Sequence, residues 1–159
     1  ALSDASAGTT VSPTVASSGT TRNTVPAHAV LYVDVRAWTS AELERVDTAV
    51  RSRTPAVDGV TVVVAGGINR GPMQPGQADE LVHLARRAAS DVGMGDVGAV
   101  AVGGASDGNL TAALGVPTLD GLGADGGGAH SDQEWVDVAS LVPRARWVAR
   151  LIDLITLRR

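Results

Sequence analysis

The side chains best suited to chemistry lie in a glycine-rich stretch, residues 121–136, which reads G-L-G-A-D-G-G-G-A-H-S-D-Q-E-W-V. It carries one histidine, His130, followed closely by Ser131, Asp132 and Glu134. Glycine allows the backbone to approach a ligand closely, and neutral imidazole is the commonest metal ligand in proteins. The combination favours a loop that brings His130 to a metal or another ligand. The alternative is a flexible loop with a solvent-facing histidine.

A second polar loop, residues 103–109 (G-G-A-S-D-G-N), lies between an apolar run and a predicted short helix. In open α/β sheets, ligands bind at the carboxyl ends of the strands, and a helix N-terminus favours anions. Ser106 and Asp107 are therefore candidate ligand-binding residues. We expect this loop on the same side of the sheet as the loop that carries His130. The alternative is that both residues only cap the helix.

The composition is that of a soluble globular protein, because 44% of the 159 residues are hydrophobic and 19% are charged. The net charge is −4 and the pI is about 5.2, and no basic stripe is available to bind phosphates, which argues against a nucleic-acid partner. Without cysteine, there is no disulfide, thiolate ligand or cysteine nucleophile. No apolar run approaches the ~20 residues that span a bilayer, and no signal peptide is visible. We expect a cytoplasmic protein without a membrane partner.

The first half of the chain predicts two strands, a helix and a third strand. Alternating β-branched residues indicate the strands, and Pro13 favours an edge position or a bulge in the first. Thr39 and Glu42 fit a capping box at the start of the helix, which Pro55 ends. The elements span residues 9–16, 27–35, 39–53 and 60–65. This order is that of a ferredoxin-like α/β sandwich without its opening strand and helix.

A linker rich in glycine and proline, residues 68–76, precedes a second half that predicts alternating helices and strands. The first helix ends at Gly93, and the apolar strand after it is expected to be buried on both faces. The elements span residues 77–92, 97–102, 106–114 and 116–119, with a last helix from about residue 140. That helix carries apolar residues on one predicted face: Leu141, Ala145, Val148, Ile152 and Ile155. The whole chain therefore predicts an α/β protein.

Several segments together resemble a family of zinc exopeptidases and deacylases that includes glutamate carboxypeptidase, succinyl-diaminopimelate desuccinylase, acetylornithine deacetylase and aminoacylase. Three resemble the C-terminal half of its catalytic domain: G-G-A-S-D-G-N, G-V-P-T-L-D-G-L-G and G-G-G-A-H-S-D-Q-E-W-V. Three earlier ones resemble its lid and the return to the catalytic domain: G-T-T-R-N-T-V-P-A, V-D-V-R and N-R-G-P-M. The resemblance implies a partial ferredoxin-like lid (dimerisation) domain over residues 1–68. The back half of a layered α/β zinc-peptidase catalytic domain follows over residues 69–159.

The resemblance also implies roles for individual residues. His130 corresponds to the histidine that closes a two-zinc site. Asn23 and Arg36 correspond to positions that hold a carboxylate or carbonyl oxygen of the substrate. Arg70, Ser106 and Asp107 correspond to positions that line the substrate cleft. Gly127 and Gly128, in the stretch from Gly126 to Gly128, correspond to backbone that approaches the substrate. Arginine offers a planar fork for a carboxylate and asparagine a neutral donor for a developing oxyanion.

Some of these residues also have other interpretations, and some polar residues match no site of the family. Arg36 at a strand end is alternatively a solvated surface charge, and Asn23 alternatively a turn residue. His28 and His83 match no family site, so we expect both to be structural or on the surface. Asp132 and Glu134 beside His130 offer only weak local coordination.

The resemblance places no catalytic residue in this chain. The family's other zinc ligands come from an N-terminal half, as a His-x-Asp motif, a Glu-Glu pair that includes the general base, and a further carboxylate. We therefore expect part of a di-zinc metallohydrolase for amide bonds of N-acyl amino acids or short peptides, inactive without that half and homodimeric through the lid. The alternative is a non-catalytic dimerisation or ligand-binding remnant. In both cases, unpaired sheet edges predict self-association or low stability.

Overall fold

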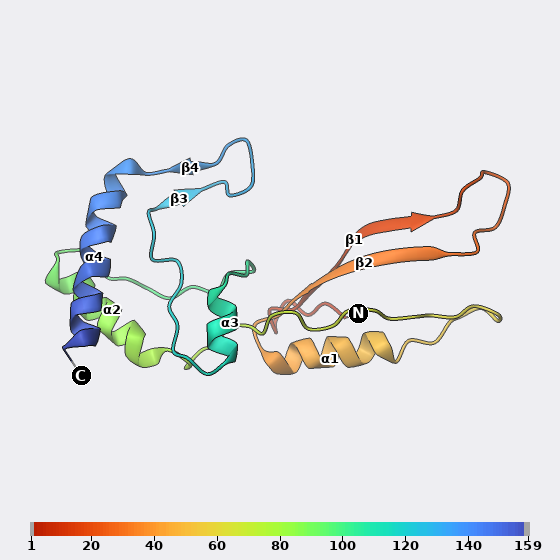
Figure 1. Cartoon of the computed structure of the whole chain (residues 1–159), viewed down its shortest axis with the longest axis horizontal. Helices are drawn as coiled ribbons and strands as arrows, with labels where there is room; N and C mark the ends of the chain where they lie inside the picture. Colours follow the sequence, from red (N-terminus) through yellow and green to blue (C-terminus); the bar gives the residue numbers. More distant parts are fainter. Residues whose placement is uncertain (1, 158–159) are drawn as a thin grey trace. The chain divides into compact units, whose positions relative to one another are not determined.

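The computed structural model describes residues 2–157, which form a mixed α/β structure (Figure 1). One compact unit contains the chain up to Gln74 together with Gly103–Ala105, and the second contains Pro75–Val102 and the chain from Ser106 onward. The first unit holds β1 (Thr10–Ser18), β2 (Ala29–Arg36) and α1 (Ser40–Arg51). The second holds α2 (Asp79–Asp91), α3 (Gly108–Ala113), β3 (Gly126–Gly127), β4 (Trp135–Val136) and α4 (Val138–Thr156).

The predicted domain boundary between residues 68 and 69 stays a prediction. The outer ends of the predicted domains, Ala1 and residues 158–159, lie outside the described residues. Within residues 2–157, no helix combines the length and the apolar character that crossing a membrane requires.

The first unit is built on the β1–β2 hairpin, a two-stranded antiparallel ribbon drawn in red and orange in Figure 1. Its register shifts between Pro13 and Val15, so Thr14 is the extra residue of a bulge. Proline has no backbone N–H for the ladder, and a bulge is a place where a sheet tolerates it. The two predicted strands and the predicted irregularity at Pro13 are confirmed.

α1 begins at a capping threonine, as predicted. The Glu42 amide donates to the Thr39 hydroxyl over 3.3 Å. The Glu42 carboxylate accepts hydrogen bonds from the Thr9 hydroxyl at 2.6 Å and from Arg45 Nη2 at 2.8 Å. These donors, Arg45 above all, lower the pKa of Glu42 below its ordinary value of 4.5. Thr9 is buried, so the contact fixes the segment before β1 onto α1.

Three predicted strands, residues 60–65, 97–102 and 116–119, do not form. The sheets of the described residues are two two-stranded hairpins, and none of these three segments belongs to either. The predicted burial of residues 97–102 is also wrong, since Val100 is 84% exposed and Val102 is 69% exposed. A strand needs a neighbouring strand to pair its backbone groups. In the first unit, the predicted ferredoxin-like sandwich is therefore reduced to the β1–β2 hairpin and α1.

The second unit is held together by α2 and α4, which pack against each other around a buried cluster. Its members come from both helices: Leu84, Ala85, Ala88, Ala89, Trp147, Leu151 and Leu154. The predicted helix over residues 77–92 is confirmed in type and near its bounds. Gly93 ends it as predicted, with a φ of +74° and its amide donating to the Ser90 carbonyl at 3.1 Å.

The predicted apolar face of α4 packs on the core only in part, since Val148 and Ile155 are partly buried against the cluster. Leu141 is 47% exposed and Ile152 is 54% exposed, whereas Trp147 and Leu151 are buried. α4 carries apolar side chains on two faces, and helical periodicity cannot tell which one packs. Tryptophan buries a large surface when its indole N–H finds an acceptor. Trp147 finds one in the Ala85 carbonyl at 2.8 Å.

Candidate functional site

The β3–β4 hairpin carries the candidate metal ligand, and its glycines have a clear structural purpose. A Cβ on Gly126 would lie 2.5 Å from the Trp135 carbonyl oxygen, and one on Gly128 would lie 2.6 Å from the Gln133 carbonyl oxygen. Such distances exclude any side chain, so the glycines allow the two short strands to pair. The predicted role of Gly127 and Gly128 as backbone that approaches substrate stays a prediction.

His130 lies at the tip of this hairpin in a left-handed backbone conformation, with a φ of 66°. This conformation is uncommon for a residue with a Cβ and persists where the surrounding structure holds it. Ser131 holds it here, because its amide and its hydroxyl both donate to the Gly128 carbonyl, at 3.0 and 2.7 Å. The Ser131 hydroxyl also accepts from the Gln133 amide at 3.2 Å. His130 is exposed, so the imidazole is presented from a hydrogen-bonded turn.

A complete metal site is not formed by the part of the chain that the structure describes. In residues 2–157, no group of three His, Asp or Glu side chains is placed to hold one ion. Asp132 and Glu134 lie on the same loop as His130, and both are exposed. Zinc takes three protein ligands in catalytic sites and four in structural ones. The residues present therefore fit one ligand of such a site and not the site as a whole.

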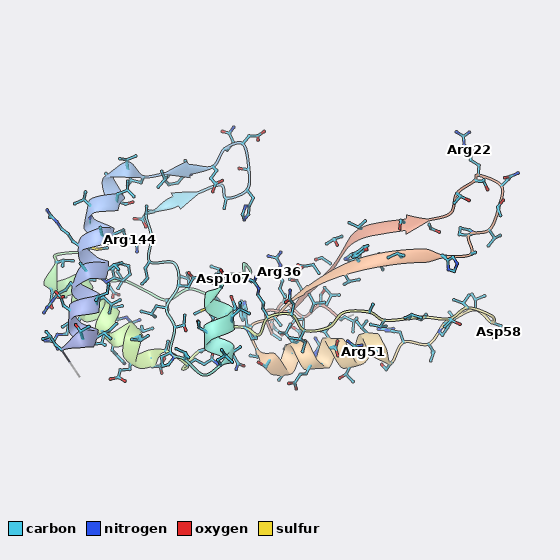
Figure 2. All side chains as sticks on the ribbon, viewed as in Figure 1. Arg22, Arg36, Arg51, Asp58, Asp107 and Arg144 are labelled. Carbon is cyan, nitrogen blue, oxygen red and sulfur yellow. The ribbon has the colours of Figure 1, made fainter. Side chains whose placement is uncertain are left out.

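The base of the hairpin is tied to the start of α4. The Asp137 amide donates to the Asp125 carbonyl at 2.8 Å. The Ser140 hydroxyl accepts from the Asp125 amide at 2.9 Å and donates to the Asp137 carbonyl at 2.6 Å. Arg144, labelled on α4 in Figure 2, forms an ion pair with the Asp125 carboxylate. Asp137 also caps α4 through the Ala139 amide, at 2.9 Å, so the helix begins earlier than predicted.

The Ser106 loop precedes α3 in the second unit. The Ser106 hydroxyl accepts from the Gly108 amide at 3.1 Å, and the Ser106 amide donates to Asn109 Oδ1 at 2.9 Å. Asp107 occupies the N-cap position without a side-chain capping hydrogen bond. The capping alternative is thus confirmed for Ser106, whereas for Asp107 the role of balancing charge at the helix start stays a prediction. A substrate contact for either residue stays a prediction.

Three predicted substrate-binding residues belong to the first unit. The Arg36 guanidinium donates from Nε to Asp34 Oδ2 at 2.7 Å and from Nη1 to the Gly103 carbonyl at 2.9 Å. Two contacts orient it, although more than half of the side chain is exposed. Asn23 lies in the exposed loop between β1 and β2, and Arg70 lies in an exposed segment. The roles of all three in binding substrate stay predictions.

The other two histidines are surface residues, as predicted. His28 lies immediately before β2 and His83 lies on α2, and both are exposed. Two cavities of the second unit, of about 380 and 290 Å³, adjoin the two ends of α2. Their linings contain none of the predicted site residues.

Comparison with known proteins places the sequence of this chain in a family. Residues 4–154 match the profile of Peptidase family M20/M25/M40. Carboxypeptidase G2 of Pseudomonas sp. (strain RS-16) is 29% identical over 147 residues, which cover 87% of this chain and 34% of that protein. The chain thus spans about a third of the length of this relative.

Proposed function

Because this chain belongs to peptidase family M20/M25/M40, as its motifs predicted, we propose that it is part of a zinc-dependent hydrolase that cleaves amide bonds. The proposed substrates are N-acyl amino acids or short peptides that end in a free carboxylate. The family match over residues 4–154 carries this proposal. The similarity to a carboxypeptidase supports cleavage next to a carboxylate.

His130 is the proposed metal ligand of this chain. A ligating imidazole must reach the metal with a free ring nitrogen, and the exposed tip of the β3–β4 hairpin offers one. The hydrogen bonds of Ser131 fix the backbone conformation of the turn, so the turn is ordered before metal binding. A ligand that is ordered in advance pays less entropy on binding. The other zinc ligands and the general base are proposed to come from polypeptide outside this chain, in a site for two zinc ions.

Arg36 is the proposed site for the substrate carboxylate. Asp34 and the Gly103 carbonyl accept hydrogen bonds from its Nε and Nη1 groups, which orients the planar guanidinium. Its Nη2 group is the proposed donor to the substrate. Orientation in advance suits a planar fork that recognises carboxylates. Asn23 is the proposed donor to a carbonyl oxygen. Arg70, Ser106 and Asp107 are proposed to line the cleft, and Gly127 and Gly128 are proposed to approach the substrate through their backbone.

Two partners are proposed, namely the N-terminal half of a family polypeptide and a second copy of the chain bound through the lid. The unpaired apolar segment 97–102 supports the first partner, because the exposed Val100 and Val102 would gain burial and backbone pairing from added strands. The β1–β2 hairpin supports the second, since Leu31 and Tyr32 are 58% and 62% exposed. Exposed apolar surface of this kind marks interaction sites.

Complementation tests the function directly. The chain is refolded with zinc and the part of carboxypeptidase G2 that lies outside the match, and release of glutamate from an N-acyl glutamate is measured. We expect hydrolysis by the mixture and by neither polypeptide alone. A mixture that forms a stable complex and hydrolyses no N-acyl amino acid or dipeptide contradicts the proposal.

A second candidate function is a non-catalytic dimerisation or ligand-binding module. The incomplete metal site of residues 2–157 favours it for the chain on its own. It predicts dimers whose mass in light scattering does not change when a chelator is added. It also predicts binding of an N-acyl amino acid without turnover, and a strictly monomeric profile contradicts it.

A further inference from the structure

An ion pair and a stacked tryptophan connect the His130 hairpin to the helical core of the second unit. The Arg144 guanidinium pairs with the Asp125 carboxylate, immediately before β3. Its Cζ lies 5.2 Å from the centre of the Trp147 ring. The Trp147 indole donates to the Ala85 carbonyl of α2 at 2.8 Å. One continuous set of contacts therefore runs from α2 through α4 to the base of the hairpin.

The hairpin needs an anchor of this kind. β3 and β4 contain two residues each, and a two-stranded hairpin is at best marginally stable by itself. β3 consists only of glycine, which loses more conformational freedom on folding than any other residue. The tip also holds His130 in an uncommon backbone conformation. Hydrogen bonds within the loop do not fix the direction in which the hairpin leaves the start of α4.

Arg144 adds a side-chain contact to the main-chain hydrogen bonds that hold the base of the hairpin. Ser140 and the Asp137 amide bond only main-chain atoms of Asp125, whereas Arg144 fixes the Asp125 side chain. The Arg144 side chain is only 22% exposed, and its Nε is buried without a hydrogen-bond partner among the described residues. An apolar side chain would avoid that desolvation penalty. The guanidinium lies between the Trp147 ring and the half-exposed Asp125 carboxylate, so this one side chain connects the base of the hairpin with the buried core.

We propose that Arg144 is a positioning residue for His130, because it holds Asp125, fixes the base of the β3–β4 hairpin and so orients the imidazole at the tip. The inference rests on the proposed role of His130 as a metal ligand. Arg144 acts only through Asp125 and the hairpin. Residues that orient a metal ligand affect metal affinity without touching the metal.

NMR relaxation and amide hydrogen exchange of the chain itself provide the first test. Arg144→Ala is compared with Arg146→Ala, which removes an exposed arginine from the same helix. We expect Arg144→Ala to lower the backbone order parameter of His130 from about 0.85 to below about 0.6. Exchange of the Asp137 amide should rise by about tenfold or more. Arg146→Ala should change neither value, and His28 and His83 serve as internal references.

Two conservative variants separate positioning from general destabilisation. Asp125→Asn keeps the size of the side chain and removes its charge, so it should loosen the same hairpin amides to a smaller extent. Arg144→Lys keeps the charge and should restore part of the order at His130. The proposal is overturned if Arg144→Ala and Asp125→Asn both leave His130 as ordered as in the wild type. It is also overturned if Ala88 in the core of α2 loosens to the same degree. If Arg144→Ala unfolds the unit, Asp125→Asn decides.

A second measurement links the hairpin to the metal. In the complemented mixture, zinc affinity is determined by competition with a chelator. We expect Arg144→Ala to weaken zinc binding by about tenfold or more, as the loss of a residue that orients a ligand does. Unchanged affinity would overturn the link to the metal. If the wild-type mixture binds no zinc, the proposed function fails, while the NMR result still decides whether Arg144 positions the hairpin.

Discussion

The two units differ in how completely their helices and strands bury apolar side chains and pair their backbone groups. In the second unit, α2 and α4 bury a cluster around Trp147, which is 3% exposed. In the first, the β1–β2 hairpin leaves Leu31 and Tyr32 exposed, and α1 supplies the buried apolar side chains of the described part, Leu43 and Val46. A helix pairs its backbone internally and needs a neighbour for one face, whereas a strand also needs neighbours along its edges. The strand-rich unit therefore depends more on a partner.

Segments that favour strands remain unpaired in both units, so the difference depends on the type of element and not on the unit. The segment 97–102 belongs to the second unit, yet it is as unpaired as residues 60–65 of the first. Both are rich in β-branched residues that favour strands. A partner that contributes strands would thus act on both units, while the α2–α4 pair should persist without it.

The largest expected effect is in the α2–α4 core. Trp147→Ala removes a buried ring and should lower the free energy of unfolding by roughly 3–5 kcal/mol. The matched variant in the first unit is Trp38→Ala, where the residue is 48% exposed. It should cost about 1 kcal/mol or less. Urea denaturation of both variants checks the comparison, and equal losses would contradict the difference drawn between the units.

A smaller effect, dependent on pH, is expected in the first unit. The pKa of Glu42 is lowered in the folded state by Arg45 and Thr9, so the contact stabilises the fold above the ordinary pKa of 4.5. This stabilisation is lost as the pH falls through the lowered value. NMR intensities of α1 amides, followed during acid titration, should show the loss. Glu42→Gln should remove this pH dependence and Glu44→Gln, on the same helix, should keep it. An identical acid transition in both variants would contradict the assignment.

The smallest effect on stability is expected on the β1–β2 hairpin. Leu31→Lys replaces a side chain that is 58% exposed, and it should change the free energy of unfolding by less than about 0.5 kcal/mol. Its effect should appear in association, because a charge on an open strand opposes pairing between copies. Sedimentation velocity should show less self-association than in the wild type, while Ser17→Lys, which removes no apolar surface, should have less effect. Full self-association by Leu31→Lys would exclude this face as an interface.

The helices could be predicted from the sequence because their signals are local. Thr39 marks the start of α1, and Gly93 marks the end of α2. The absence of strands at residues 60–65 and 97–102 could not be predicted. A run of β-branched residues favours a strand, but the strand forms only where a neighbouring strand pairs with it. Helical periodicity also could not predict which face of α4 packs against α2. Apolar residues line two faces, and Trp147 decides between them through the Ala85 carbonyl.

Of the candidate site, too, one part could be predicted from the sequence and another part could not. His130 and the glycines of its loop were recognisable from residue types at short spacing, and the structure places them on one hairpin. The ion pair of Asp125 with Arg144 left no such signal, since these residues are 19 positions apart in the sequence and their contact forms only in the folded second unit. Asp137 before an apolar helix was a capping signal that could have been used.

The most direct test of the central claim compares the three histidines in the complemented mixture. His130→Ala, His28→Ala and His83→Ala are each refolded with zinc and the non-matching part of carboxypeptidase G2, and hydrolysis of an N-acyl glutamate is measured. If His130 is a metal ligand, His130→Ala should lower kcat/KM by about a hundredfold or more, while the two surface variants should keep wild-type activity. Full activity of His130→Ala in a mixture whose wild type is active would contradict the account.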